Sequence, residues 1–378
     1  MADFEDLDIY MSGPYIDGDD VEFVKDAVLN GWYGSKAYWY VENFENNFAN
    51  YHDRKFALMT TNCTSAIHLI LQALNISEED EVLVPDITWI GSAAPIIYQN
   101  AKPIFVDVNR NSWCIEPEDI LRKITSKTKA LISVNVYGNM ADYEKIEKIC
   151  QENNIVLIED AAESLGSMYK QKKSGSFGTA SVFSFHRTKT LTTGEGGMLL
   201  LDDEKLYERS KFLRDHGRFP GSFFNMEVTY KYMPSNLAAS LGYSQLQKID
   251  KLIAKKRYIL NFYRQNIKNH GEFSLNPEPE NHVNGAWCSA LVFSEHNDLN
   301  GKDLMDFMSS NKIPTRPFFY PLTKLPAFAN LFDLQKIDNP VAEILSYKGC
   351  CLPSAMNMDD TQLQNVANVV NSFLKLKA

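Results

Sequence analysis

The stretch from Ser181 to Asp202, SVFSFHRTKTLTTGEGGMLLLD, places one lysine, Lys189, between two apolar runs. Both runs are typical of short buried strands, and the glycines of the GEGG sequence let the connection between them turn sharply. A lysine held among apolar walls loses part of its preference for the ammonium form. Its amine then becomes nucleophilic enough to form a Schiff base with a carbonyl. Most loop lysines are simply solvated, so the interpretation of Lys189 depends on the other polar residues.

A second group of polar residues, NCTS at 62–65, stands where a predicted strand, 56–60, is followed by a predicted helix, 66–74. Free backbone N–H groups and the positive end of a helix dipole favour a phosphate at such a position, and hydroxyl groups add donors. The same residues are also typical of an ordinary helix N-cap. Ser184, in the strand before Lys189, is a further candidate phosphate donor, unless backbone groups satisfy its hydroxyl.

Asp160 follows an apolar run, 155–158, where a carboxylate is unfavourable unless it is paired. A carboxylate beside a pyridine nitrogen keeps that nitrogen protonated and makes the ring an electron sink; the alternative is a helix cap. Trp89 is a candidate to stack on a planar ring, although an isolated aromatic residue is more often part of a core. Together with Lys189 and residues 62–65, these residues predict a site for pyridoxal 5′-phosphate.

Short β-branched strands alternate with amphipathic helices from Phe56 to Asp160, which is typical of a parallel, doubly wound sheet. Ligands of such sheets bind beyond the carboxyl ends of the strands, where the candidate residues fall. After Asp202 the chain is predicted to be helical, and its last part to form a smaller α/β unit. We therefore expect an α/β protein of two domains. Residues 1–250 form a large cofactor-binding domain that includes the N-terminal segment, and residues 251–378 form a small C-terminal domain.

The composition narrows the class of protein. The chain has 378 residues, 44% hydrophobic and 23% charged, as in a globular enzyme. Its formal net charge of −10 argues against nucleic acid and anionic membranes as partners. Six scattered cysteines indicate reduced thiols and neither a disulfide framework nor a metal site. The acidic first residues contain no secretion signal, and no apolar run is long enough to span a membrane. We therefore expect a cytoplasmic protein.

Seven motifs in order resemble the DegT/DnrJ/EryC1/StrS aminotransferase family, and the resemblance extends over nearly the whole chain. They are NCTSA at 62–66, VPDITW at 84–89, IEDAAE at 158–163, FSFHxxK at 183–189, GEGG at 194–197, MPSNL at 233–237 and RPFFYP at 316–321. Within the family the chain is most similar to the sugar 4-aminotransferases of the GDP-perosamine synthase branch. The resemblance implies fold type I of the pyridoxal phosphate enzymes, the aspartate aminotransferase fold, and a homodimer whose active sites lie at the subunit interface.

The resemblance also implies roles for individual residues. Lys189 matches the lysine that forms the Schiff base and moves the proton between cofactor and substrate carbon, and Asp160 matches the partner of the pyridine nitrogen. Trp89 matches the stacking aromatic residue and Glu163 the residue near the cofactor 3′-oxygen. The remaining matches are phosphate contacts, namely Cys63, Thr64, Ser184 and, from the other subunit, Asn236. We further expect five residues to bind substrate: Trp32, Tyr33, His186, Arg316 and Tyr320.

Two departures from the family pattern bear on the chemistry. Cys63 stands where glycine is usual, which requires a negative φ there. The segment PLTKLP at 321–326 lacks the histidine that many members carry between the two prolines and that helps to hold a sugar nucleotide.

The expected reaction moves the amino group of L-glutamate onto a ketone. The acceptor is predicted to be a nucleotide-linked 4-keto-6-deoxy sugar for surface polysaccharide synthesis. The missing histidine keeps a small phosphorylated ketone, such as dihydroxyacetone phosphate, as the alternative.

Three other functions fit the sequence less well. A sugar dehydratase on the same scaffold replaces the lysine with histidine, whereas this chain has Lys189. A non-catalytic, cofactor-binding regulator keeps the fold, but here the catalytic set is complete and no DNA-binding module precedes it. A nicotinamide-dependent enzyme would carry GxGxxG after its first strand, and this chain does not.

Overall fold

The computed structural model describes residues 9–219, 221–268, 271–332 and 337–377. The acidic first residues, from which no secretion signal was predicted, lie mostly outside this range. In the part of the chain described, no helix combines the length and the apolar character that crossing a membrane requires.

The strands are β1 (Phe56–Thr60), β2 (Glu81–Pro85), β3 (Lys102–Val106), β4 (Thr128–Val134), β5 (Val156–Asp160), β6 (Met168–Tyr169), β7 (Lys172–Lys173), β8 (Ala180–Ser184), β9 (Gly197–Leu201), β10 (Phe273–Leu275), β11 (His282–Val283), β12 (Ser289–Phe293), β13 (Arg316–Pro317) and β14 (Gly349–Leu352). The α-helices are α1 (Gly18–Asn30), α2 (Trp39–Tyr51), α3 (Cys63–Ala73), α4 (Ala94–Tyr98), α5 (Pro117–Lys123), α6 (Tyr143–Asn153), α7 (Glu204–Arg214), α8 (Asn236–Gln247), α9 (Ile249–Asn266), α10 (Gly301–Ser310), α11 (Pro326–Ala329), α12 (Pro340–Lys348) and α13 (Asp360–Lys377). Four short 3-10 turns complete the set: Gly34–Lys36, Ile90–Ser92, Val136–Gly138 and Leu322–Lys324.

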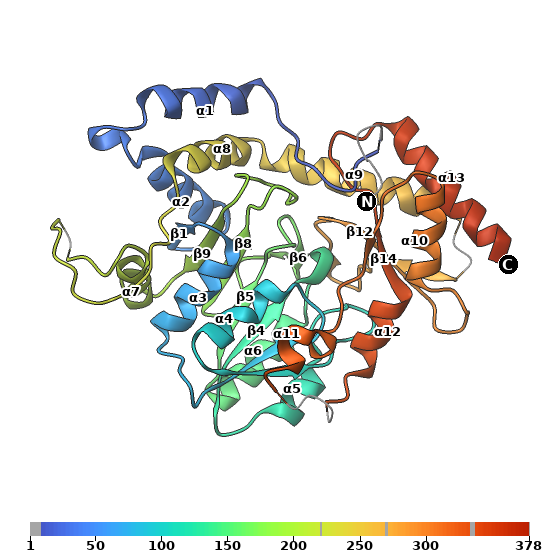
Figure 1. Ribbon diagram of the computed structural model, residues 1–378, viewed down its shortest axis with the longest axis horizontal. Coiled ribbons are helices and arrows are strands. Elements are labelled where there is room, and N and C mark those ends of the chain that lie inside the picture. The colour runs from blue at the N-terminus through green and yellow to red at the C-terminus, as the bar shows by residue number, and fades with distance from the viewer. Residues whose placement is uncertain (1–8, 220, 269–270, 333–336, 378) are drawn as a thin grey trace.

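A seven-stranded sheet with the order β1-β9-β8-β5-β4-β2-β3 forms the centre of the molecule (Figure 1). The pairs β8–β5, β5–β4, β4–β2 and β2–β3 are parallel, whereas β9 is antiparallel to both β1 and β8. The prediction of a mostly parallel α/β sheet is therefore confirmed. Residues 185–196 join β8 to β9 without a crossover helix, and the two strands pair in the antiparallel direction.

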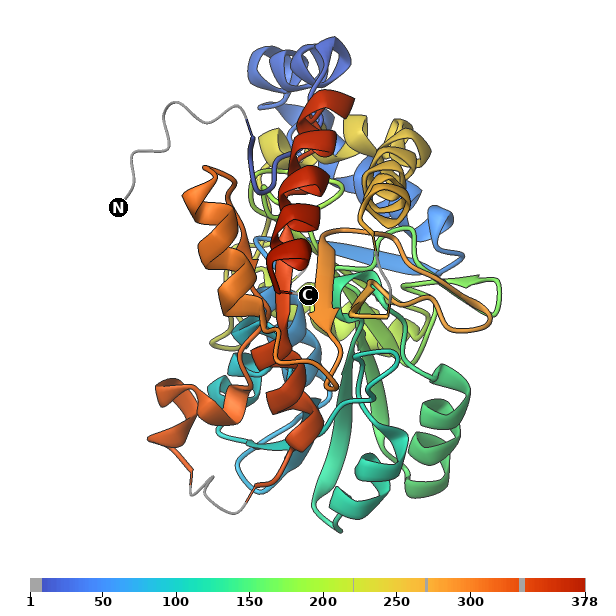
Figure 2. The same cartoon turned by 90° about the vertical axis from the view of Figure 1, so that its right-hand side faces the viewer.

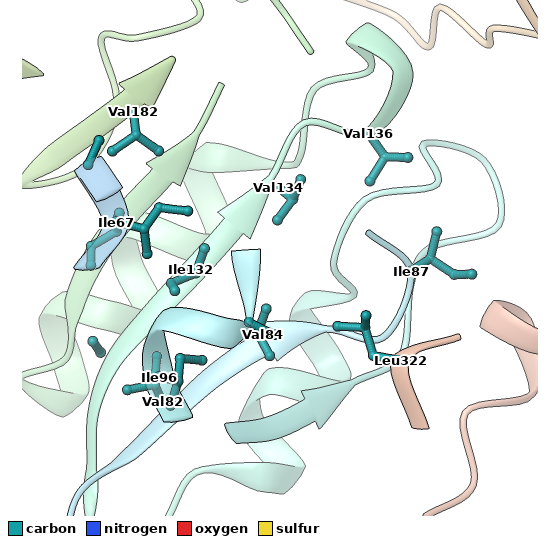
Figure 3. Close-up of a cluster of buried hydrophobic side chains, with 14 of the residues drawn as sticks. Ile67, Val82, Val84, Ile87, Ile96, Ile132, Val134, Val136, Val182 and Leu322 are labelled. Atoms are coloured by element: carbon teal, nitrogen blue, oxygen red, sulfur yellow. The ribbon is translucent and has the colours of Figure 1, made fainter. Parts of the chain in front are cut away.

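Both faces of this sheet are covered, as the nearly continuous apolar strands require. Successive residues of β9 point to opposite faces. Leu199 and Leu201 pack with α3, while Met198 and Leu200 pack with α2 and α8. Farther along the sheet, α5 and α6 cover the same face as α2 and α8. Figure 3 shows the core on the α3 side, which continues past the strand ends to Ile87 and Leu322.

A second sheet, with the order β10-β12-β14-β13, lies in the C-terminal part beside α10 and α13 (Figure 2). It packs its own core, which also includes Ile9 from the N-terminal segment. Helix α9 leads from the first sheet to the second, and the boundary predicted after residue 250 falls at its start. Ala290, Phe318 and Leu345, however, belong to the core of the large sheet. We keep the two-domain division as a proposal.

Two regions differ from the sequence expectation. The aromatic-rich first fifty residues of the sequence predict one helix, 20–29, in an otherwise irregular segment, whereas the structure contains a second helix there, α2, whose Phe44 and Phe48 are fully buried. Strand β5 continues to Asp160, so this aspartate is the last residue of the strand and does not follow it. Both differences have a tertiary cause, since burial against the sheet and pairing with β4 and β8 extend these elements.

Candidate active site

The turn from β1 into α3 forms a narrow cradle at the carboxyl edge of the large sheet. The Asn62 side chain accepts from the Ser65 amide (2.8 Å) and caps the helix, which leaves the amides of Cys63 and Thr64 for a ligand. Gly197, between β1 and β8, keeps this turn close to the sheet, because a Cβ there would lie 2.5 Å from the Asn62 carbonyl carbon. A Cβ on Gly91 would likewise lie 2.9 Å from Thr64 Oγ1.

Cys63 is the first residue of α3 and is not among the residues with positive φ, so the departure from glycine costs no backbone strain. Its half-buried thiol lies 4.0 Å from Asp160 Oδ1. Burial, together with the neighbouring carboxylate of Asp160, raises the pKa of this thiol well above its usual value, so the group is neutral.

Asp160 lies at the carboxyl end of β5, with 3% of its surface exposed. Its Oδ2 accepts from Ser92 Oγ (2.7 Å) and its Oδ1 from the Ala162 amide (3.0 Å). Burial raises the pKa of this carboxyl group, while the Ser92 hydroxyl and the Lys189 ammonium oppose the rise. A second cation, such as a protonated ring nitrogen, would complete the charge pairing that burial demands.

Lys189 lies in the connection between β8 and β9, as predicted, and its amide donates to the His186 carbonyl (2.8 Å). Its side chain is 12% exposed, and Nζ lies 3.1 Å from Glu163 Oε1. Glu163 is held by the Tyr137 amide, which donates to Oε2 (2.9 Å). Burial raises the pKa of the Glu163 carboxyl group, and the Lys189 ammonium counteracts this rise. The structure thus brings Lys189, Glu163, Asp160 and Cys63 into one electrostatic group.

A wall of aromatic rings extends from the lysine. Lys189 Nζ lies 3.7 Å from the centre of the Trp287 ring, and Tyr137 lies parallel to Trp287 at 6.0 Å. Phe319 also stacks on Tyr137, at 4.8 Å, and its ring centre is 6.3 Å from that of Trp89. Trp89 is 65% exposed. It precedes the turn that carries Ser92, the residue that donates to Asp160, and its exposed indole is open to a planar ligand.

Two of the predicted residues follow Asp160 around the same edge. Ser184 ends β8, opposite Gly197 of β9, and its hydroxyl accepts from the His186 amide (3.3 Å). His186 Nε2 lies 3.6 Å from Glu195 Oε1, and burial lowers the pKa of this imidazole. Arg316 lies within electrostatic range of His186 and donates to Ser12 Oγ (3.2 Å). The guanidinium of Arg316 adds to the lowering of the His186 pKa, and a shared role of the two residues in binding an anionic substrate stays a prediction.

The other predicted residues stand apart from the lysine. Trp32, Tyr33 and Tyr320 are 57%, 86% and 59% exposed. Asn236 Oδ1 accepts from the Tyr40 amide (3.0 Å), and its Nδ2 donates to the carbonyls of Gly31 and Lys36. Within the described residues, no hydrogen bond, ion pair or ring contact joins Trp32, Tyr33, Tyr320 or Asn236 to Lys189.

The residues fit pyridoxal 5′-phosphate in three respects. The first turn of α3 offers unpaired amides to a phosphate, Asp160 offers a buried carboxylate to a ring nitrogen, and Lys189 offers an amine to the aldehyde. When bound, this group supplies an electron sink for the carbon that exchanges its amino group. Four residues complete the site without having been predicted from the sequence, namely Ser92, Gly91, Tyr137 and Trp287.

Only part of this second set left a signal in the sequence. Ser92 follows the VPDITW motif by three residues, which places it at the same strand end. Tyr137 has a φ of 53°, in the left-handed region that a tyrosine seldom adopts, and no local pattern predicts such a conformation. Trp287 and Thr188 are 99 residues apart in the chain, although the indole Nε1 donates to the Thr188 carbonyl. Only the tertiary fold brings Trp287 to the lysine.

Known proteins are similar to this chain over nearly its whole length. The family model described as the DegT/DnrJ/EryC1/StrS aminotransferase family matches residues 14–371. GDP-perosamine synthase of Escherichia coli O157:H7 is 36% identical over 361 residues, which are 95% of this chain and 97% of that protein. The putative pyridoxal phosphate-dependent aminotransferase EpsN of Bacillus subtilis is 32% identical over 370 residues, 96% of this chain and 95% of that protein.

Solved structures share the fold. The putative sugar aminotransferase Spr1654 of Streptococcus pneumoniae, in its PMP form, superposes with a TM-score of 0.90 at 23% identity, covering 98% of this chain and 100% of the other. PseC of Helicobacter pylori, an aminotransferase involved in the biosynthesis of pseudoaminic acid, gives 0.89 at 24% identity, covering 97% and 99%.

Proposed function

Because the chain belongs to the DegT/DnrJ/EryC1/StrS aminotransferase family, we propose that it transfers the amino group of L-glutamate to the keto group of a nucleotide-linked 4-keto-6-deoxy sugar. The chain is a pyridoxal phosphate-dependent aminotransferase, as its family and the predicted cofactor site indicate. One observation carries the proposal. Lys189, Asp160 and the open first turn of α3 converge at the carboxyl edge of one sheet.

Each of these residues has a defined task in this proposal. The amides of Cys63 and Thr64, with the hydroxyls of Thr64 and Ser184, hold the phosphate. Asp160, oriented by Ser92, keeps the proton on the ring nitrogen. Lys189 accepts and returns a proton at Nζ, and Glu163, 3.1 Å away, stabilises its ammonium form after it has accepted that proton.

The relatives guide the choice of acceptor. Three GDP-perosamine synthases are 30–36% identical to this chain over nearly its whole length, which supports a nucleotide sugar and a role in surface polysaccharide synthesis. A small phosphorylated ketone remains the second candidate, because of the segment 321–326. There Thr323 donates its hydroxyl to Asp86 (2.8 Å) and is buried, so it does not replace the missing histidine.

We further propose that the protein acts as a cytoplasmic homodimer. Residues 216–219 and 221–231, between α7 and α8, project from the body of the protein (Figure 1). Phe223, Phe224 and Val228 on this projection are each at least two-thirds exposed. Apolar surface of this kind favours coverage by a partner, and a second copy would also bring Asn236 to a neighbouring site. The cysteines of the described residues are all free thiols, which suits a reducing compartment.

The test begins with the purified protein and pyridoxal 5′-phosphate. Borohydride should attach the cofactor irreversibly to Lys189, as peptide mass spectrometry would show. Lys189→Ala should lose this label and all turnover while keeping its circular dichroism spectrum; Lys211→Ala, which changes an exposed lysine, should keep both. Turnover by Lys189→Ala would refute the proposal. A screen with L-glutamate then compares keto sugars carrying different nucleotides with dihydroxyacetone phosphate.

A further inference from the structure

Among the residues that the structure describes, the ammonium group of Lys189 contacts one carboxylate, that of Glu163, and one aromatic ring, that of Trp287. Glu163 Oε1 lies 3.1 Å from Nζ, and the centre of the Trp287 ring lies 3.7 Å from the same atom. The indole face carries a negative quadrupole, so a cation at this distance is attracted to it, most strongly where water is excluded. Lys189 is 12% exposed in its side chain and Trp287 is 8% exposed, which meets that condition.

Trp287 is held in place from several directions. Its Nε1 donates to the Thr188 carbonyl (2.8 Å), one residue before the lysine, and the Tyr137 ring lies parallel to it with an interplanar angle of 6°. Its backbone carbonyl accepts from Lys256 Nζ (2.9 Å). The indole therefore has little freedom to leave the lysine.

A buried lysine, Lys256, is an uncommon residue to hold the backbone of Trp287. It is 1% exposed, and its ammonium group donates to the carbonyls of Trp287 and Ser354, at 2.9 and 2.7 Å. Burial lowers the pKa of Lys256 to about 8. Burying a lysine against two carbonyl groups costs free energy, and it fixes the backbone next to β12 at the point where Trp287 projects toward the lysine.

We propose that Trp287 and Glu163 form a seat that holds Lys189 whenever its amine is not bonded to the cofactor. The inference rests on the proposed function, which makes Lys189 the residue that bonds pyridoxal 5′-phosphate. To form that bond, the ammonium gives up a proton and the nitrogen attaches to the aldehyde carbon. The aldehyde oxygen leaves as water. Forming this bond consumes the free ammonium group that the indole face and Glu163 attract, so the seat opposes bonding and favours the free lysine.

This competition predicts an effect that a merely structural tryptophan would not have. Pyridoxal 5′-phosphate bonds Lys189 and empties the seat, whereas pyridoxamine 5′-phosphate has no aldehyde and leaves the lysine seated. Removing the indole face should therefore tighten the binding of the aldehyde form about 5- to 30-fold, the range expected for a largely desolvated cation–π contact. Binding of the amine form should stay within about twofold, since the lysine is free both before and after binding.

The experiment measures both dissociation constants on cofactor-free protein, by absorbance or fluorescence titration, for the wild type, Trp287→Leu and Trp287→Phe. Phenylalanine keeps a smaller ring face and should shift the ratio of the two constants by less than leucine does. Trp113→Leu is the matched control, because Trp113 is a buried tryptophan in the core of the large sheet. It should lower stability and leave the ratio unchanged.

The outcomes separate the inference from the proposed function. If Trp287→Leu weakens both cofactor forms equally, or leaves both unchanged, Trp287 does not seat the lysine and the inference is wrong. A shift of the ratio in Trp113→Leu equal to that in Trp287→Leu would overturn it as well. If borohydride fails to join the cofactor to Lys189 in the wild type, the proposed function itself fails, and the inference falls with it.

Discussion

Replacement of Asp160 by asparagine tests the electronic role of this residue with little disturbance of the fold. The asparagine Oδ1 would still accept from the Ala162 amide, and its Nδ2 would face Ser92 Oγ. The Ser92 hydroxyl also shares a hydrogen bond with Thr88 Oγ1 (2.9 Å), and either oxygen is able to donate. Reversing this pair of hydroxyls lets Ser92 accept from the new amide, so no buried polar group is left unpaired.

The asparagine removes the negative charge that the ring nitrogen of the cofactor requires. A hydrogen bond to a charged group contributes about 1.5–3 kcal/mol, so the dissociation constant for pyridoxal 5′-phosphate should rise about 10- to 150-fold. Proton removal from the substrate should also slow, because an unprotonated ring is a poorer electron sink. Spectral titration measures the affinity, and rapid mixing with L-glutamate measures the rate.

The neighbouring carboxylate provides the control. Glu159 points to the opposite face of β5, where it accepts from Asn135, Gly175, Phe177 and Ser181. Glu159→Gln should lower stability but leave cofactor affinity within about twofold of the wild type. Affinity and rate that are unchanged in Asp160→Asn would refute the assignment of Asp160 to the ring nitrogen.

The remaining predictions concern stability. Glu45→Gln should lower the free energy of unfolding by about 3–5 kcal/mol, because it leaves the buried Arg214 guanidinium without its carboxylate. The control, Glu227→Gln, breaks the half-exposed pair with Arg209 and should lower it by no more than about 1 kcal/mol. Equal losses of stability in the two variants, measured by urea titration, would contradict this prediction. Burial raises the pKa of Glu159 to about 7, so its proton is bound more tightly in the folded state. The stability advantage of the wild type over Glu159→Gln should therefore shrink by up to about 3 kcal/mol as the pH rises from about 4.5 to 7. Urea titrations of both proteins at several pH values measure this difference. An advantage that grows with pH would show that the carboxylate form of Glu159 is the stabilising one.

The fold was predictable from the sequence where the spacing of apolar residues along one helix face, or one continuous apolar run, is enough to determine a helix or a strand. The order of strands and helices from β1 to β5 follows from apolar runs that must be buried, either as sheet strands or as the inner faces of helices. The direction of β9 and the helix α2 were not predictable in this way. The direction of a strand depends on the strand with which its apolar run pairs. The apolar face of α2 is buried by α8 and the sheet, so this helix depends on tertiary packing.

The site divides in the same way. Residues 62–65, Asp160 and Lys189 stand at or just after the carboxyl ends of β1, β5 and β8, which run in the same direction in one sheet, so their convergence follows from topology. Trp287 and Tyr137 could not be found, because one comes from the region before β12 and the other depends on a strained backbone. Asn236, Trp32 and Tyr33 stay predictions, since their expected role concerns a second copy of the chain or a substrate.

The two side chains that contact Lys189, those of Glu163 and Trp287, come from segments next to different sheets. Glu163 follows β5 of the large sheet, and Trp287 precedes β12 of the small one. Two buried aspartates at the edge of the large sheet bind the later part of the chain. Asp86 accepts from Thr323 and Asn339, and Asp107 accepts from the first amides of α12.

A rigid rotation of everything after residue 250 would break all of these bonds and expose Leu322, which packs beside Ile87 (Figure 3). The cost of losing several buried hydrogen bonds together, at about 1–3 kcal/mol for each group left unsatisfied, argues against such a rotation. The position of Trp287 beside the connection that carries Lys189 is consequently a property of the whole fold, so the seat is in place whenever the amine of the lysine is free.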